Sequence, residues 1–165
     1  MLRYLIVLSF AVFSCFWTAI FYRPLNTHVN NLLVATFGED FLSLRTTIQA
    51  NFPLSDTLIY NVPGAMWIFG LSLLGWRLYL GTGVVKIHLF YVALFIGQFF
   101  ELIQAFQLTD GTFDWYDLGW NFIGFFAALA FCRLMPDHWR AGKGHWRYIL
   151  FFVVFVAAFG VDVLS

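Results

Sequence analysis

The stretch FFELIQAFQLTDGTFDWYDLGWNFIGF, residues 99–125, decides the fold of this chain. It joins two apolar runs through residues 109–112, whose Thr, Asp and Gly residues are typical of turns. Two apolar helices joined by so short a turn form an antiparallel hairpin. Polar side chains are costly next to lipid. A group of them nevertheless surrounds this turn and requires a physical reason: Glu101, Gln104, Asp114, Asp117 and Asn121.

The rest of the chain is equally apolar. Of its 165 residues, 61% are hydrophobic, 22% are aromatic and only 11% are charged, and the mean hydropathy is +0.79. Soluble domains carry about 25% charged residues, so we expect an all-α fold, a polytopic transmembrane helix bundle forming a single integral membrane domain over residues 1–165. The net charge is zero and no basic stripe is present, which excludes a nucleic-acid-binding protein.

Five apolar runs are long enough to cross the hydrocarbon layer, which takes about 20 helical residues. They cover residues 4–22, 58–80, 84–107, 115–134 and 148–164. The first run is followed by Arg23 instead of a small-x-small cleavage pattern, which favours a retained helix over a signal peptide. Residues 24–56 are more polar and carry apolar residues at helical spacing. We therefore expect an outer interfacial loop with a helix on the membrane surface.

The basic residues predict the orientation of the bundle, because short cytoplasmic loops carry an excess of Lys and Arg. An N-terminus in the cytoplasm and a C-terminus outside place seven basic residues inside and two outside. The inner residues are Arg3, Arg77, Lys86, Arg133, Arg140, Lys143 and Arg147, and the outer ones are Arg23 and Arg45. Most acidic residues then lie outside, which makes the outer side the candidate working face.

Helical spacing sorts the polar residues of the opening stretch onto two faces. Gln98, Glu101 and Gln104 are three residues apart and share one face of the third span. Glu101 would be expensive in lipid, so this face is expected to point into the bundle, where an ionisable residue indicates function.

The fourth span carries a second stripe that includes Asp117, Asn121 and Gly124. Gly124 permits close packing, and we expect it to face the third span, with Phe125 facing lipid. Asp114 is expected to cap the start of the fourth span.

The short turn brings Glu101 near Asp117, so we expect an outward-opening polar pocket that also includes Gln104 and Asn121. With few cations nearby, two such carboxylates must share a proton, bind an ion or take an arginine from the first loop. The four His and two Cys residues lack metal-ligand spacing, so neither a metal site nor a cofactor is expected.

The pattern Glu101-x-x-Gln104, a short turn, then Asp117-x-x-x-Asn121-x-x-Gly124 resembles the signature of VanZ-like membrane proteins. An acidic residue entering an earlier span, here Asp56, also fits. Thr57 and Tyr60 stand where the family usually has Lys and His, so the resemblance implies a divergent member. It implies location in a bacterial cytoplasmic membrane, action on a lipid or cell-wall precursor, and a link to reduced susceptibility to teicoplanin.

The residues also leave other functions open. One alternative is a small proton- or cation-handling transporter subunit, in which Glu101 carries the ion. Another is a structural partner of a larger membrane protein complex. Two carboxylates can perform general acid–base chemistry, but no Ser, Cys or His nucleophile stands beside them. This pattern leaves catalysis open and favours a role other than that of a conventional enzyme.

Overall fold

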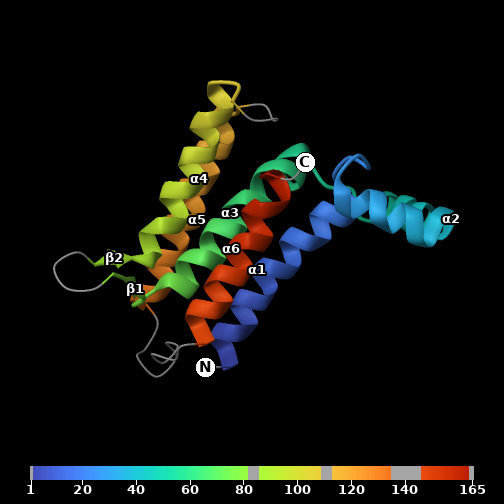
Figure 1. Cartoon of the computed structure of the whole chain (residues 1–165). Helices are drawn as coiled ribbons and strands as arrows, with labels where there is room; N and C mark the ends of the chain where they lie inside the picture. Colours follow the sequence, from blue (N-terminus) through green and yellow to red (C-terminus); the bar gives the residue numbers. More distant parts are fainter. Residues whose placement is uncertain (1, 82–85, 109–112, 135–145, 164–165) are drawn as a thin grey trace.

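The computed structural model describes residues 2–81, 86–108, 113–134 and 146–163, and the described residues are almost entirely helical (Figure 1). The helices are α1 (Leu2–Phe21), α2 (His28–Asn51), α3 (Asp56–Gly75), α4 (Leu89–Ala105), α5 (Trp115–Leu134) and α6 (Trp146–Val163). Two short strands, β1 (Tyr79–Leu80) and β2 (Ile87–His88), pair between α3 and α4. The expected all-α fold is therefore confirmed.

Helix α3 occupies the centre of the bundle and contacts α1, α4, α5 and α6 (Figure 1). Helices α4 and α5 form the hairpin expected from the opening stretch. One end of the bundle carries the start of α1 and the two strands, and we call it the β end. The opposite end carries α2, the end of α4 and the starts of α3 and α5, and we call it the α2 end.

The hydrophobic core lies toward the β end. Its fully buried side chains come from α3, from the start of α4 and from α6, and include Leu71, Leu74, Leu89, Phe90 and Phe151. The core continues along α5 through Phe125 and Ala128. The polar side chains of α3, α4 and α5 lie mostly at the α2 end.

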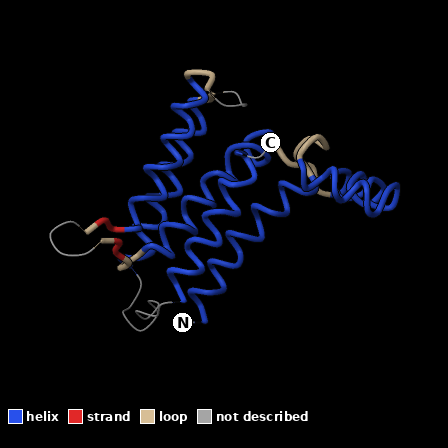
Figure 2. The backbone as a smooth tube through the Cα atoms, viewed as in Figure 1, coloured by secondary structure: helices blue, strands red, loops and turns tan. Residues whose placement is uncertain are grey.

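The expected boundary between the second and third spans is wrong. Helix α3 ends at Gly75 and not at residue 80, and α4 begins at Leu89 and not at residue 84. The helix stops because Trp76 leaves helical geometry and Arg77 adopts a φ of 63°. Strands β1 and β2 lie side by side (Figure 2) and pair antiparallel, with Tyr79 opposite His88.

Helix α2 is divided at Gly38, whose φ of 57° and ψ of −131° are not helical. Glycine tolerates a positive φ that other residues rarely adopt. Asn30 and Arg45, on opposite sides of Gly38, both donate to carbonyl groups at the end of α1, so the chain folds back at this glycine. Its expected position on a membrane surface stays a prediction.

Side chains of α2 satisfy the last carbonyl groups of α1, which have no partner within their own helix. Asn30 Nδ2 donates to Ala19 O at 3.2 Å, and Arg45 Nη1 donates to Ile20 O at 3.0 Å. Gln49 Nε2 donates to Phe21 O at 2.6 Å. The most polar segment of the sequence thus serves as a cap that holds α2 against α1.

A buried arginine caps the C-terminal end of α3. Arg147, near the start of α6, is 1% exposed. Its Nη2 donates to the carbonyl oxygens of Leu74 at 2.9 Å and Trp76 at 2.8 Å, and lies 3.4 Å from Leu73 O. A positive charge is favourable at the C-terminal end of a helix dipole.

Two helices, Asp56–Gly75 and Trp115–Leu134, are long and apolar enough to cross a membrane. Three shorter apolar segments accompany them: Leu5–Phe21, Leu89–Ala105 and Trp146–Val156.

Candidate functional site

Polar side chains from three helices and one loop meet at the α2 end of the bundle. We call this group the polar cluster; it consists of Arg23, Asn61, Gln98, Glu101, Asp117 and Asn121. Its central contact joins α3 to α5: Asn61 Nδ2 donates to Asp117 Oδ1 at 2.7 Å. Asn61 is 8% exposed, so this hydrogen bond lies inside the bundle. A hydrogen bond to a charged acceptor is among the stronger contacts in a protein.

Glu101 and Gln98 contribute the α4 side of the cluster. The charges of Asp117 and Asp114 both act on Glu101, and the backbone N–H of Asp114 faces the same carboxyl group. Gln98 Nε2 donates to Leu118 O on α5 at 3.3 Å. Two acceptor atoms, Glu101 Oε2 and Gln98 Oε1, are buried without a hydrogen-bond partner.

Arg23 supplies the positive charge of the cluster. It follows α1, and its guanidinium acts electrostatically on Asp117. Its Nε is buried without a hydrogen-bond partner. The sequence offered an arginine from the first loop as one of three ways to balance the carboxylates. In the structure, Arg23 is the arginine whose charge acts on Asp117.

Asn121 lies one turn beneath Asp117 on α5 and is 6% exposed. Its amide sits between two glycines that leave room for it: an added Cβ at Gly64 would lie 3.4 Å from Asn121 Oδ1, and one at Gly97 would lie 3.5 Å from Nδ2. Among the described residues its side chain makes no hydrogen bond. The Asn121 amide therefore lies at the base of the polar cluster, between α3 and α4.

The expected neighbour of Gly124 is wrong. A Cβ at Gly124 would lie 2.1 Å from Ala65 O, so this glycine packs against the α3 backbone and not against α4. The expectation that Phe125 faces lipid is also wrong, because Phe125 is 6% exposed and its ring lies 4.8 Å from that of Phe90. Helix α5 packs most extensively on α3, which turns both residues inward.

Three further residues of the sequence prediction have clear positions. Asp114 Oδ1 accepts from the Tyr116 backbone N–H at 2.9 Å, which confirms it as the cap of α5. Gln104 is half-buried one turn beyond Glu101. Asp56 is exposed in the first turn of α3 and does not join the contacts of the polar cluster described above. The turn predicted at residues 109–112 lies outside the described residues.

Two members of the cluster were missed by sequence reasoning in these roles. Asn61 is a polar residue within an apolar run, and that signal alone marks it as a candidate for interhelical hydrogen bonding. Arg23 was one of two outer arginines that the sequence offered as a partner for the carboxylates, without a choice between it and Arg45. Its proximity to Asp117 depends on how α1 packs on α3, which no local pattern records.

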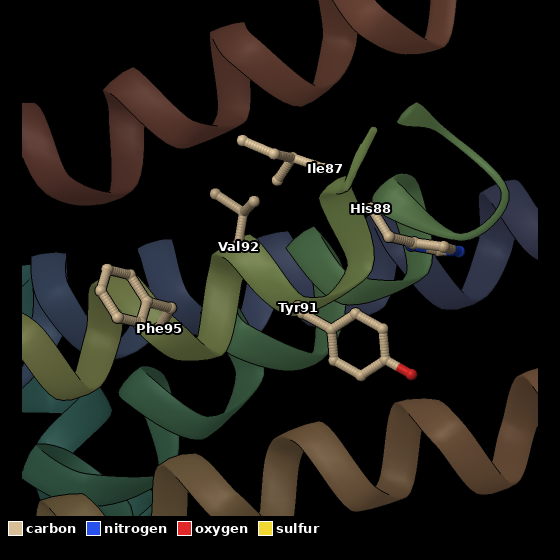
Figure 3. Close-up of a pocket in the computed structure, with 5 residues that line it drawn as sticks. All are labelled: Ile87, His88, Tyr91, Val92 and Phe95. Atoms are coloured by element: carbon tan, nitrogen blue, oxygen red, sulfur yellow. The ribbon is translucent and has the colours of Figure 1, made fainter. Parts of the chain in front are cut away.

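An open hollow of about 370 Å³ lies apart from the polar cluster, near the β end (Figure 3). Its lining comes from β2 and the first turns of α4, namely Ile87, His88, Tyr91, Val92 and Phe95. These side chains are mostly apolar, and three of them are exposed: Ile87 on β2 and Tyr91 and Phe95 on α4. We place the candidate site at the polar cluster, where buried charges require partners, and not at this hollow.

Within the described part of the chain, no three His, Cys, Asp or Glu side chains gather closely enough to hold a metal ion. Comparison with protein-family models, curated proteins and solved structures gives no match to this chain. Function must therefore be argued from the polar cluster and its surroundings.

Proposed function

We propose that the chain is a multi-pass membrane protein of the VanZ-like type whose polar cluster binds the head group of a lipid or lipid-linked cell-wall precursor. The proposal places it in a bacterial cytoplasmic membrane with the α2 end outside. The observation that carries it is the meeting of Glu101, Asp117 and Asn61 among helices that are otherwise apolar. Ionisable residues in such surroundings are expensive and mark a functional site.

The outward surfaces of the helices support a lipid environment. Large apolar side chains are exposed on α1, α4, α5 and α6, for example Phe10, Phe95, Phe126 and Ile149. Soluble monomers rarely expose apolar patches of this extent. The distribution of basic residues, seven against two, supports the proposed orientation.

Binding is favoured over ion transport by what lies beneath the cluster. Toward the β end, the residues that follow Asn121, Asn61 and Gln98 into the core are apolar and buried, including Ile68, Phe90 and Phe125. A proton or cation pathway requires polar or ionisable groups along its length. The cluster is instead suited to hold a ligand at one side of the membrane.

Topology is tested by cysteine labelling. In a variant with the two buried cysteines, Cys15 and Cys132, replaced by Ala, new cysteines are placed at exposed Leu108 and exposed Lys86. In intact cells, Leu108→Cys is expected to react with a membrane-impermeant maleimide, whereas Lys86→Cys is expected to react only after permeabilisation. The opposite pattern would place the polar cluster on the cytoplasmic side and contradict the proposed function.

Lipid binding is tested by photo-crosslinking in cells. A photoreactive residue at half-buried Gln104, beside Glu101, is expected to form adducts enriched in one lipid species. The same residue at exposed Ile149 on α6 reports bulk lipid. Mass spectrometry of the adducts compares the two positions. Adducts from Gln104 that consist of protein alone would favour the structural-partner alternative and contradict the proposal.

A further inference from the structure

The unpartnered atoms on the α4 side of the polar cluster are both hydrogen-bond acceptors. Glu101 Oε2 and Gln98 Oε1 are buried without a partner and lie one helical turn apart. Gln98 Nε2 already donates to Leu118 O, which commits the nitrogen and leaves the oxygen. A buried acceptor without a donor costs about 1–3 kcal/mol. A ligand that satisfies these atoms must therefore bring N–H or O–H donors.

The charges of the cluster are unevenly balanced. Asp117 accepts from Asn61 and lies within the field of Arg23. Glu101 has neither a hydrogen bond from Asn61 nor the nearby charge of Arg23. The charges of two carboxyl groups, those of Asp114 and Asp117, act on it instead, whereas the guanidinium of Arg23 acts on Asp117. This imbalance favours a positively charged ligand at Glu101.

Asn121 adds a polar group at the base of the cluster. It is 6% exposed, and no hydrogen bond satisfies its amide among the described residues. It lies between Gly64 and Gly97, one turn inward from Asn61, Glu101 and Asp117. Neither atom of this amide is among the fully buried atoms without a partner, so the amide presents an accessible polar group at the base of the cluster.

We propose that the polar cluster binds a primary ammonium group, a specificity that rests on the proposed function and narrows it. An ammonium carries one positive charge and three N–H donors. Its N–H groups match the two unpartnered acceptors of α4, Glu101 Oε2 and Gln98 Oε1. Divalent hard cations require about six oxygen ligands, more than these side chains supply. A quaternary ammonium has the same charge without any N–H, so the proposal predicts discrimination against it.

The test compares lipids that differ only in the head-group nitrogen. The full chain is purified in detergent, and binding of phosphatidylethanolamine and phosphatidylcholine with identical acyl chains is measured by native mass spectrometry. We expect phosphatidylethanolamine to bind at least about tenfold more tightly, the effect of about 1.4 kcal/mol from N–H donation to a charged acceptor. Glycerophosphoethanolamine, a soluble form of the head group, is expected to compete for the site.

Substitutions locate the effect. Glu101→Gln is expected to abolish the preference while keeping a side chain of similar shape, and Glu39→Gln, at an exposed acid of α2, is expected to preserve it. Equal affinity of the wild type for the two lipids would overturn the ammonium proposal and leave head-group binding in place. Failure of both lipids to bind, together with no lipid-enriched adduct at Gln104, would overturn the proposed function itself. Competition by the soluble head group without any lipid preference would assign the ammonium to a soluble ligand.

Discussion

Gly124→Ala is expected to lower the free energy of unfolding by about 3 kcal/mol, an overpacking effect at the upper end of the usual range. The added methyl group would lie 2.1 Å from Ala65 O and 2.8 Å from its carbonyl carbon, and a backbone carbonyl in a central helix cannot move aside as a flexible side chain can. Helix α5 must therefore separate from α3. The gain of about 1 kcal/mol in helix propensity from replacing glycine is too small to compensate.

The same helix provides a matched control. Gly119 has no atom within 4 Å of its added Cβ, so Gly119→Ala is expected to leave stability unchanged or raise it by up to about 1 kcal/mol. Unfolding of both variants is followed by circular dichroism during titration from mild detergent into sodium dodecyl sulfate. If Gly124→Ala unfolds no earlier than Gly119→Ala, the close contact between α5 and α3 is wrong.

Arg147→Met is the second substitution expected to have a large effect, about 3 kcal/mol. It leaves the carbonyl groups of Leu74 and Trp76 without their donor in a buried position, and hydrogen bonds from a charged donor are worth about 1.5–3 kcal/mol each. Methionine keeps much of the side-chain volume, so the loss reports the polar contacts. Arg147→Lys retains a charged donor and is expected to recover part of the stability.

Arg133 allows a comparison at a second helix end. It is exposed in the last turn of α5, where removal of its charge is expected to cost about 0.5 kcal/mol through the helix dipole alone. The same detergent titration measures Arg147→Met against Arg133→Met. Equal losses in the two variants would show that Arg147 contributes no more than an ordinary charge at a helix end.

The sequence predicted the number and order of the helices well because these depend on apolar runs, which are local. It predicted the helix ends around the strands poorly, because α3 stops where its backbone meets another segment. A Cβ at Gly75 would lie 2.6 Å from the carbonyl carbon of Leu89, and no pattern near Gly75 shows this contact. The cap at Asp114 involves neighbouring residues only and was correctly predicted.

The candidate site was predicted in part for the same reason. Helical spacing and a short connection are enough to bring Glu101 toward Asp117. The direct partner of Asp117 is Asn61, 56 residues earlier in the chain, and Gly124 faces Ala65 on the same helix. Sequence proximity favoured α4 as the neighbour of α5. Instead, α3 approaches α5 more closely, because small residues of α3, which include Gly64 and Ala65, leave room between the two backbones.

The cap formed by Arg147 has a consequence for how the protein is made. Its carbonyl partners precede it by 71 to 74 residues, so ribosomes complete α3 long before they reach the arginine that closes its end. During that interval the end of α3 lacks this cap. Nascent chains that stop short of α6 therefore lack the donor that satisfies these carbonyl groups.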